Sequence, residues 1–151
     1  MAQMSKDQAE RHLLQVLAEF RHQLRSFLQF SERAAHRANL HPQQHQLLLQ
    51  VAGAPQGAVA SIAYAAWRLG LRHNSTVELV DRSVAQGLLD RTSDPRDRRR
   101  VTLEITVKGR RILKKLSQNH ARELRELGPF LIRSLRRIER ADRARTRQRA
   151  R

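Results

Sequence analysis

A run of five polar residues in the middle of the chain has side chains that can contact nucleotide bases. The run consists of Arg72, His73, Asn74, Ser75 and Thr76. Asparagine pairs bidentately with adenine and arginine with guanine, while serine and threonine hydrogen-bond to phosphates or base edges. Two structural alternatives remain for members of the run. Ser75 can serve as a helix-capping hydroxyl, and Asn74 as a turn residue that tolerates the left-handed conformation.

The surrounding residues predict that this run begins a short helix over residues 73–86. Gly70 and Gly87 flank the helix, and glycine readily takes the left-handed conformation that ends a helix. A preceding helix is predicted from Ser61, a suitable N-cap, to Leu69. Two short helices joined by a glycine-containing turn form a helix-turn-helix. The exposed amides at the N-terminus of the second helix also favour a phosphate.

A cluster of arginines follows in residues 94–100. Its members are Arg96, Arg98, Arg99 and Arg100. They stand against Asp94 and Asp97, so four positive and two negative charges leave a net +2 in these seven residues. The sequence SDPRD has turn chemistry, and residues 88–92 and 100–106 have strand character. We therefore expect a β-hairpin with an arginine-rich tip.

The helix over 73–86 and its flanks, in contrast, carry no net charge. Across residues 72–88, Arg72 and Arg82 balance Glu78 and Asp81. The contrast predicts that the helix contacts base edges while the hairpin contacts phosphates. Arg82 has two alternatives, a phosphate contact or an ion pair with Asp81 or Glu78.

The composition favours a polyanionic partner. The chain of 151 residues is about one domain long and carries a formal charge of +16, with 30 Lys+Arg against 14 Asp+Glu. Nucleic acid is the first candidate, and an anionic membrane surface is the second. Residues 141–151 are predicted to form a disordered basic tail, with phosphate contacts as the alternative.

Several other classes of site are excluded or disfavoured. The absence of cysteine excludes disulfides, thiolate metal sites and cysteine-based redox sensing. His41 and His45 have a spacing that can share a metal, but no nearby carboxylate completes the set, so neither a metal nor a cofactor is predicted. No catalytic motif stands out, which predicts a protein that is not an enzyme. The polar N-terminus and the lack of a long apolar run predict a cytoplasmic, nucleoid-associated protein without a membrane partner.

Long helices are predicted at both ends of a single domain spanning residues 1–151. Residues 6–38 and 107–140 carry narrow apolar stripes of helical spacing, with a break predicted at Gly128-Pro129. Such stripes suit packing against a second subunit. The positions assigned to dimerisation are Leu13, Leu17, Phe20, Leu24, Leu131, Leu135 and Ile138. Between the long helices, residues 42–106 are predicted to form a lobe that contains the helix-turn-helix and the hairpin. The predicted fold class is therefore mainly α with a small β-hairpin (α+β).

The order of several short motifs resembles a known family. The motifs are RLGL (68–71), ST (75–76), LVDR (79–82), QGL (86–88), DPRDRRRV (94–101) and ITVKG (105–109). Together they resemble the winged helix-turn-helix of the MarR (multiple antibiotic resistance regulator) transcription factors. Ala65, Glu78 and Ser83 depart from the usual pattern of the family, which leaves the preferred base sequence open.

This resemblance implies a homodimer whose long terminal helices form the interface, bound to pseudo-palindromic double-stranded DNA. It also implies that Asp97 and Arg99 brace the hairpin, leaving Arg96 and Arg98 for the minor groove. Many members of the family bind a small aromatic or anionic effector in a cleft beside the DNA-binding lobe. Tyr64 and Trp67 are candidates to line such a cleft, with ordinary packing as the alternative, and no effector-binding residue is assigned.

The sequence thus predicts a homodimeric, sequence-specific DNA-binding regulator of transcription, a repressor released by a small molecule. A non-specific architectural nucleic-acid-binding protein is the first alternative, because the high net charge alone can bind DNA. A metal-responsive regulator is the second alternative, because seven histidines are present.

Overall fold

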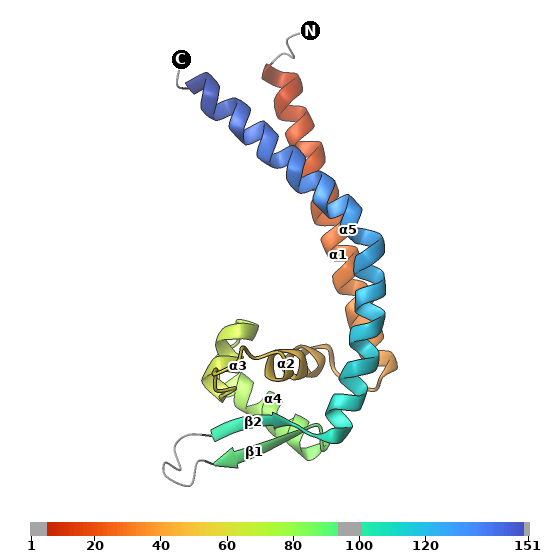
Figure 1. The fold of residues 1–151 in the computed structure, drawn as a ribbon, viewed down its shortest axis with the longest axis vertical. Helices are drawn as coiled ribbons and strands as arrows, with labels where there is room; N and C mark the ends of the chain where they lie inside the picture. The colour runs from red at the N-terminus through yellow and green to blue at the C-terminus, as the bar shows by residue number, and fades with distance from the viewer. Residues whose placement is uncertain (1–5, 94–100, 150–151) are drawn as a thin grey trace. The chain divides into compact units, whose positions relative to one another are not determined.

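The computed structural model describes residues 6–93 and 101–149. Within these residues the elements follow in the order α1 (Lys6–Arg37), α2 (Pro42–Ala52), α3 (Ile62–Leu69), α4 (His73–Ala85), β1 (Leu89–Ser93), β2 (Val101–Ile105) and α5 (Val107–Arg149), as Figure 1 shows. The predicted fold class, mainly α with one β-hairpin, is confirmed.

The chain divides into two compact units. We call Met1–Ser31 together with His120–Arg151 the helical arm, and Glu32–Asn119 the lobe. In the helical arm, α1 meets α5 at His120, whose Nε2 lies 2.8 Å from the Ser31 hydroxyl oxygen. The same imidazole packs edge-on against Phe27 and Phe30, with ring centroids 5.8 and 5.5 Å apart. This contact joins the two long helices within the arm.

The lobe is built around a core of leucines from α2, α4 and the hairpin. The fully buried members are Leu47, Leu48, Leu79, Leu88, Leu89 and Leu103. Burial of each such side chain contributes about 1.5–3 kcal/mol. The strands pair antiparallel, from Leu89 opposite Ile105 to Ser93 opposite Val101. The core and this register hold α4 and the hairpin in fixed positions within the lobe.

The predicted helix-turn-helix is confirmed with its caps. The Ser61 hydroxyl accepts a hydrogen bond from the Tyr64 amide at 3.1 Å and so caps α3. Gly70 ends α3 in the left-handed conformation, with φ of 64°. Gly87, just beyond α4, is also left-handed, with φ of 66°. Glycine takes this conformation without the steric cost that a side chain adds.

Two predictions for α5 were wrong. The helix is continuous from Val107 to Arg149, with Pro129 inside it, so Gly128-Pro129 does not interrupt it. A proline removes one backbone donor at a cost of about 3 kcal/mol, which the long helix-forming sequences on both sides outweigh. The backbone is also helical over residues 141–149, where a disordered tail was expected. Alanine, arginine and glutamine in this segment all have high helix propensity.

Candidate nucleic-acid interface

Helix α4 has one buried face and one exposed face. Thr76, Leu79, Val80 and Ser83 are buried at the helical spacing of three and four residues, and they pack toward the lobe core. The exposed side chains lie at the N-terminal end and along the opposite face. The polar ones are Arg72, His73, Asn74, Ser75, Glu78, Asp81 and Arg82. Four of the five residues in the polar run therefore present their side chains to solvent.

The N-terminal end of α4 is not capped by a side chain. Arg72 occupies the N-cap position and makes no side-chain capping hydrogen bond. Ser75 lies inside the helix, so its hydroxyl is not the capping group that the structural alternative required. Asn74 is also helical, and Asn39 is the only described non-glycine residue with positive φ. The uncapped amides of the first turn leave donors available for an external acceptor.

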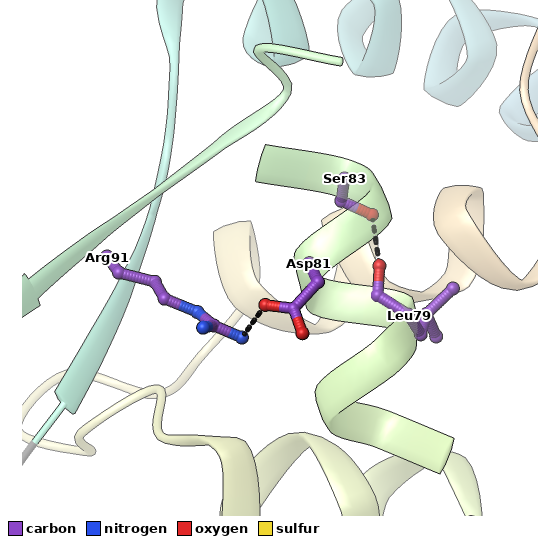
Figure 2. Close-up of polar contacts among 4 residues, drawn as sticks. All are labelled: Leu79, Asp81, Ser83 and Arg91. Carbon is purple, nitrogen blue, oxygen red and sulfur yellow. Dashed lines mark hydrogen bonds and ion pairs between the residues drawn. The ribbon is translucent and has the colours of Figure 1, made fainter. Parts of the chain in front are cut away.

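Thr76 was predicted to contact DNA, and the structure contradicts this assignment. Its side chain is fully buried, and its hydroxyl donates to the Arg72 carbonyl at 3.0 Å. A threonine can occupy a buried helical position because its hydroxyl bonds to the carbonyl one turn earlier. Ser83 does the same, donating to the Leu79 carbonyl at 2.8 Å (Figure 2). Both polar residues therefore belong to the packed face of α4.

An ion pair joins α4 to the hairpin. The Arg91 guanidinium lies 2.6 Å from the Asp81 carboxylate, as Figure 2 shows. Both side chains are substantially exposed, so the pair contributes at most about 1 kcal/mol. Asp81 therefore pairs with Arg91 of β1. An ion pair between Asp81 and Arg82 was one of the alternatives for Arg82, and the structure does not contain it. Within the described residues Arg82 has no ion-pair partner, and the residue is exposed.

Hydrogen bonds hold the base of the hairpin and the first turn of α5 against the residues that follow α4. The Thr106 hydroxyl donates to the Gly87 carbonyl at 2.8 Å, and the Thr106 amide donates to the Leu88 carbonyl at 3.2 Å. The Lys108 ammonium donates to the Gln86 carbonyl at 2.7 Å. The hairpin strands are thus anchored beside the C-terminal end of α4. The tip itself, residues 94–100, lies outside the described residues, so the roles of Arg96, Arg98 and Arg99 stay predictions.

A further set of exposed cations was not singled out from the sequence. It lies in the first turns of α5 and consists of Lys108, Arg110, Arg111, Lys114 and Lys115. A count of charge along each predicted helix, rather than along the hairpin and tail alone, would have found it. We call these five residues the α5 basic face.

The other candidate sites receive less support. Trp67 is 75% exposed, with the Arg68 guanidinium carbon 5.7 Å from its ring centroid, whereas the Tyr64 hydroxyl is buried. The two aromatic side chains thus have different surroundings.

His41 caps α2, its Nδ1 accepting from the Gln43 amide at 3.3 Å, while His45 is buried. Among the residues whose side chains are described, no group of three His, Asp or Glu is arranged to hold a metal.

Comparison with known proteins identifies this arrangement of helices and hairpin. Residues 38–100 match the family model described as "MarR family". Over this segment the chain is similar to the MarR family. A MarR family transcription regulator of known structure superposes with a TM-score of 0.71 at 20% identity, covering 93% of this chain and 92% of its own. A search of the curated proteins gave no significant match.

Two other similar structures are of complexes. CouR from Rhodococcus jostii RHA1, bound to p-coumaroyl-CoA, matches with a TM-score of 0.57 at 25% identity, covering 66% of this chain and 68% of CouR. A MepR variant from S. aureus, bound to an oligodeoxyribonucleotide, matches with a TM-score of 0.62 at 15% identity, covering 87% of this chain and 95% of MepR.

The structural similarity shows the fold: the chain has the helical architecture of a MarR family transcription regulator of known structure. In this chain α3 and α4 form the helix-turn-helix, and β1 and β2 form the β-hairpin that follows it. Within the described residues, no helix has the length and apolar character that crossing a bilayer requires.

Proposed function

We propose that this protein is a homodimeric transcriptional regulator that reads DNA with the N-terminal half of α4. The observation that carries the proposal is the division of α4 into a packed face through Thr76 and an exposed, uncapped N-terminus. Arg72 and Asn74 have the donor and acceptor groups that distinguish guanine and adenine in the major groove. The MepR variant bound to an oligodeoxyribonucleotide supports DNA as the ligand.

Selection from a library of randomised 30-base-pair duplexes tests this function and requires no known operator sequence. We expect enrichment of a pseudo-palindrome whose half-sites lie about 34–36 Å apart, one turn of the double helix. Two identical reading helices related by a two-fold axis require that symmetry. A library that remains random after repeated selection would contradict the proposal.

The helical arm supports a homodimer. Helix α1 leaves Leu14, Leu17, Leu24 and Leu28 exposed along one side, separate from the side that carries Val16 and Phe27. On α5, Leu124 and Leu135 are 42% and 47% exposed. A continuous exposed apolar stripe is typical of an interface.

Of the seven residues assigned to dimerisation, Leu17, Leu24 and Leu135 are exposed. Leu13, Phe20, Leu131 and Ile138 are partly buried already within the chain.

Leu24→Glu should therefore dissociate the dimer. A buried leucine contributes about 1.5–3 kcal/mol, and a two-fold interface contains it twice, so the dissociation constant should rise about a hundredfold or more. Sedimentation equilibrium measures this constant. His22→Glu is the matched control, since His22 is exposed on the same helix but belongs to no apolar stripe. Equal dissociation constants for the two variants would disprove the role of this stripe.

We also propose that the regulator is a repressor, acting in the cytoplasm at the nucleoid, and that a small aromatic or anionic effector releases it. The CouR complex with p-coumaroyl-CoA supports the effector. An effector shifts DNA binding only if its affinity differs between the DNA-competent and DNA-incompetent forms. Titration of candidate aromatic acids and their CoA thioesters against the protein–duplex complex tests this, and an unchanged duplex affinity with every compound would contradict it.

The second candidate function, a non-specific architectural DNA-binding protein, is favoured by one observation. The exposed part of α4 and its flanks are formally neutral, whereas the whole chain carries +16. Charge outside the reading helix supplies sequence-independent affinity. The two functions differ in the ratio of specific to non-specific affinity.

A further inference from the structure

The α5 basic face is the densest concentration of one charge in the described part of the chain. Residues 108–115 contain five cations and no acidic residue, a net +5 in eight residues. The wing tip, with four arginines and two aspartates, carries +2 in seven. From Glu104 to Glu123 the sequence contains no other carboxylate side chain.

All five cations lie on the solvent side of α5. The opposite side of these turns packs on the lobe through Gly109, Leu113 and Leu116, which are buried. At 100° per residue, the exposed positions between them cover the whole outer half of the helix. The hydrogen bond from Lys108 to the Gln86 carbonyl places the beginning of this surface at the C-terminal end of α4. The cations therefore form one continuous surface that is fixed within the lobe.

This surface is unfavourable for the isolated helix. Arg110 with Lys114, and Arg111 with Lys115, are like charges four residues apart, a spacing that destabilises a helix. Cations in the first turn also oppose the helix dipole, and no acidic residue lies there. Within the described residues none of the five has an ion-pair partner.

An ordinary solvated helix face mixes both signs of charge, and this chain provides an example. Farther along the same helix, Arg122 and Arg125 alternate with Glu123 and Glu126. The contrast within one helix separates the α5 basic face from a simple excess of arginine in the composition. An external polyanion would offset the local repulsion, because it supplies the carboxylate-like charges that the chain lacks here.

We propose that the α5 basic face is a second DNA-backbone contact of the lobe, binding phosphates beyond the base pairs that α4 reads. Eight helical residues span about 12 Å. A DNA duplex of the same length carries about seven phosphate charges. Helix α4 has 13 residues and is therefore about 20 Å long. The basic face lies beside the C-terminal end of α4, whereas Arg72 and Asn74 lie at its N-terminal end. We therefore expect it to contact the DNA strand that borders the groove rather than the bases. This inference extends the proposed function, since it takes DNA as the ligand of the lobe.

The test uses a variant with Arg110→Gln, Arg111→Gln, Lys114→Gln and Lys115→Gln, in the full-length protein. Lys108 is retained because of its bond to Gln86. The control carries Arg122→Gln, Arg125→Gln, Arg136→Gln and Arg137→Gln, four exposed cations elsewhere on α5, so that both variants lose the same charge. Affinity for the selected duplex and for a shuffled duplex is measured from about 50 to about 300 mM salt, the range over which phosphate contacts lose most of their affinity.

In the basic-face variant, the slope of log affinity against log salt should fall by roughly one for each phosphate contact removed, on both duplexes. The ratio between the two duplexes should stay within about threefold, because backbone contacts carry no sequence information. The control should keep the wild-type slope to within about one. Equal slopes for the basic-face variant and the wild-type protein would overturn the proposal, as would an equal fall in the control.

Two further results keep this test separate from the test of the proposed function. If the wild-type protein does not distinguish the duplexes, sequence-specific reading fails, while the difference in salt slope still supports the backbone contact. Binding to phosphatidylserine vesicles that exceeds binding to DNA, and that is lost in the variant, would overturn DNA as the occupant. Should the quadruple variant unfold, Lys114→Gln with Lys115→Gln should give about half the change in slope.

Discussion

Asn74→Ala should lower the affinity for the selected duplex about fivefold or more while leaving the affinity for a shuffled duplex within about twofold. A bidentate contact between asparagine and adenine contributes about 1–3 kcal/mol of discrimination, and 1.4 kcal/mol corresponds to a factor of ten. Asn74 is exposed in the first turn of α4, so the change removes no packing within the lobe. Fluorescence anisotropy with the two duplexes at one salt concentration measures both affinities.

Thr76→Val is the matched control for this prediction. Valine keeps the buried shape of Thr76 and removes only the hydroxyl that donates to the Arg72 carbonyl at 3.0 Å. The Thr76 amide donates to the same carbonyl, also at 3.0 Å, so the acceptor stays satisfied. We expect unchanged duplex affinities and a change in stability of about 1 kcal/mol or less. Loss of discrimination in Thr76→Val but not in Asn74→Ala would reverse the assignment of the two faces.

Gly109→Ala should destabilise the lobe by about 2–4 kcal/mol. A Cβ at position 109 would lie 2.3 Å from the carbonyl oxygen of Leu88 and 3.2 Å from its carbon. Because these are backbone atoms, no side chain can rotate away, and α5 must move from the end of α4. That movement strains the hydrogen bonds from Thr106 to Gly87 and Leu88. Urea unfolding at one protein concentration measures the loss.

Gly128→Ala is the control, since it places the same methyl group in the same helix. A Cβ at Gly128 meets no atom within 4 Å outside its chain neighbours. The gain in helix propensity and the crowding by the following Pro129 ring oppose each other, so we expect a change within about 1 kcal/mol. A Gly109→Ala protein as stable as Gly128→Ala would show that α5 does not approach Leu88 as closely as described.

The elements with local sequence signals were predicted well. Ser61, Gly70 and Gly87 act through their own backbone conformation or a hydrogen bond three residues away, so their roles can be read without the fold. Residue type alone was a poorer guide for Thr76, because a polar side chain was assumed to be exposed. Its spacing to Leu79 and Val80 marks the same stripe and would have predicted its burial.

Other features depend on the folded arrangement and could not be predicted from local sequence. Asp81 has Arg82 beside it in the chain, yet it pairs with Arg91 on the neighbouring strand. Adjacent residues on a helix point in different directions, and the register that brings β1 alongside α4 is a property of the packed lobe. The close approach of Gly109 to Leu88 has the same origin, since it joins the start of α5 to the end of α4.

One ratio of affinities decides whether the exposed N-terminus of α4 reads base sequence. It is the affinity of the wild-type protein for the selected duplex divided by its affinity for a shuffled duplex of equal length, at about 150 mM salt, close to physiological ionic strength. We expect a ratio of about a thousand or more. A ratio near one would contradict it and would make the +16 charge, rather than α4, the source of DNA binding.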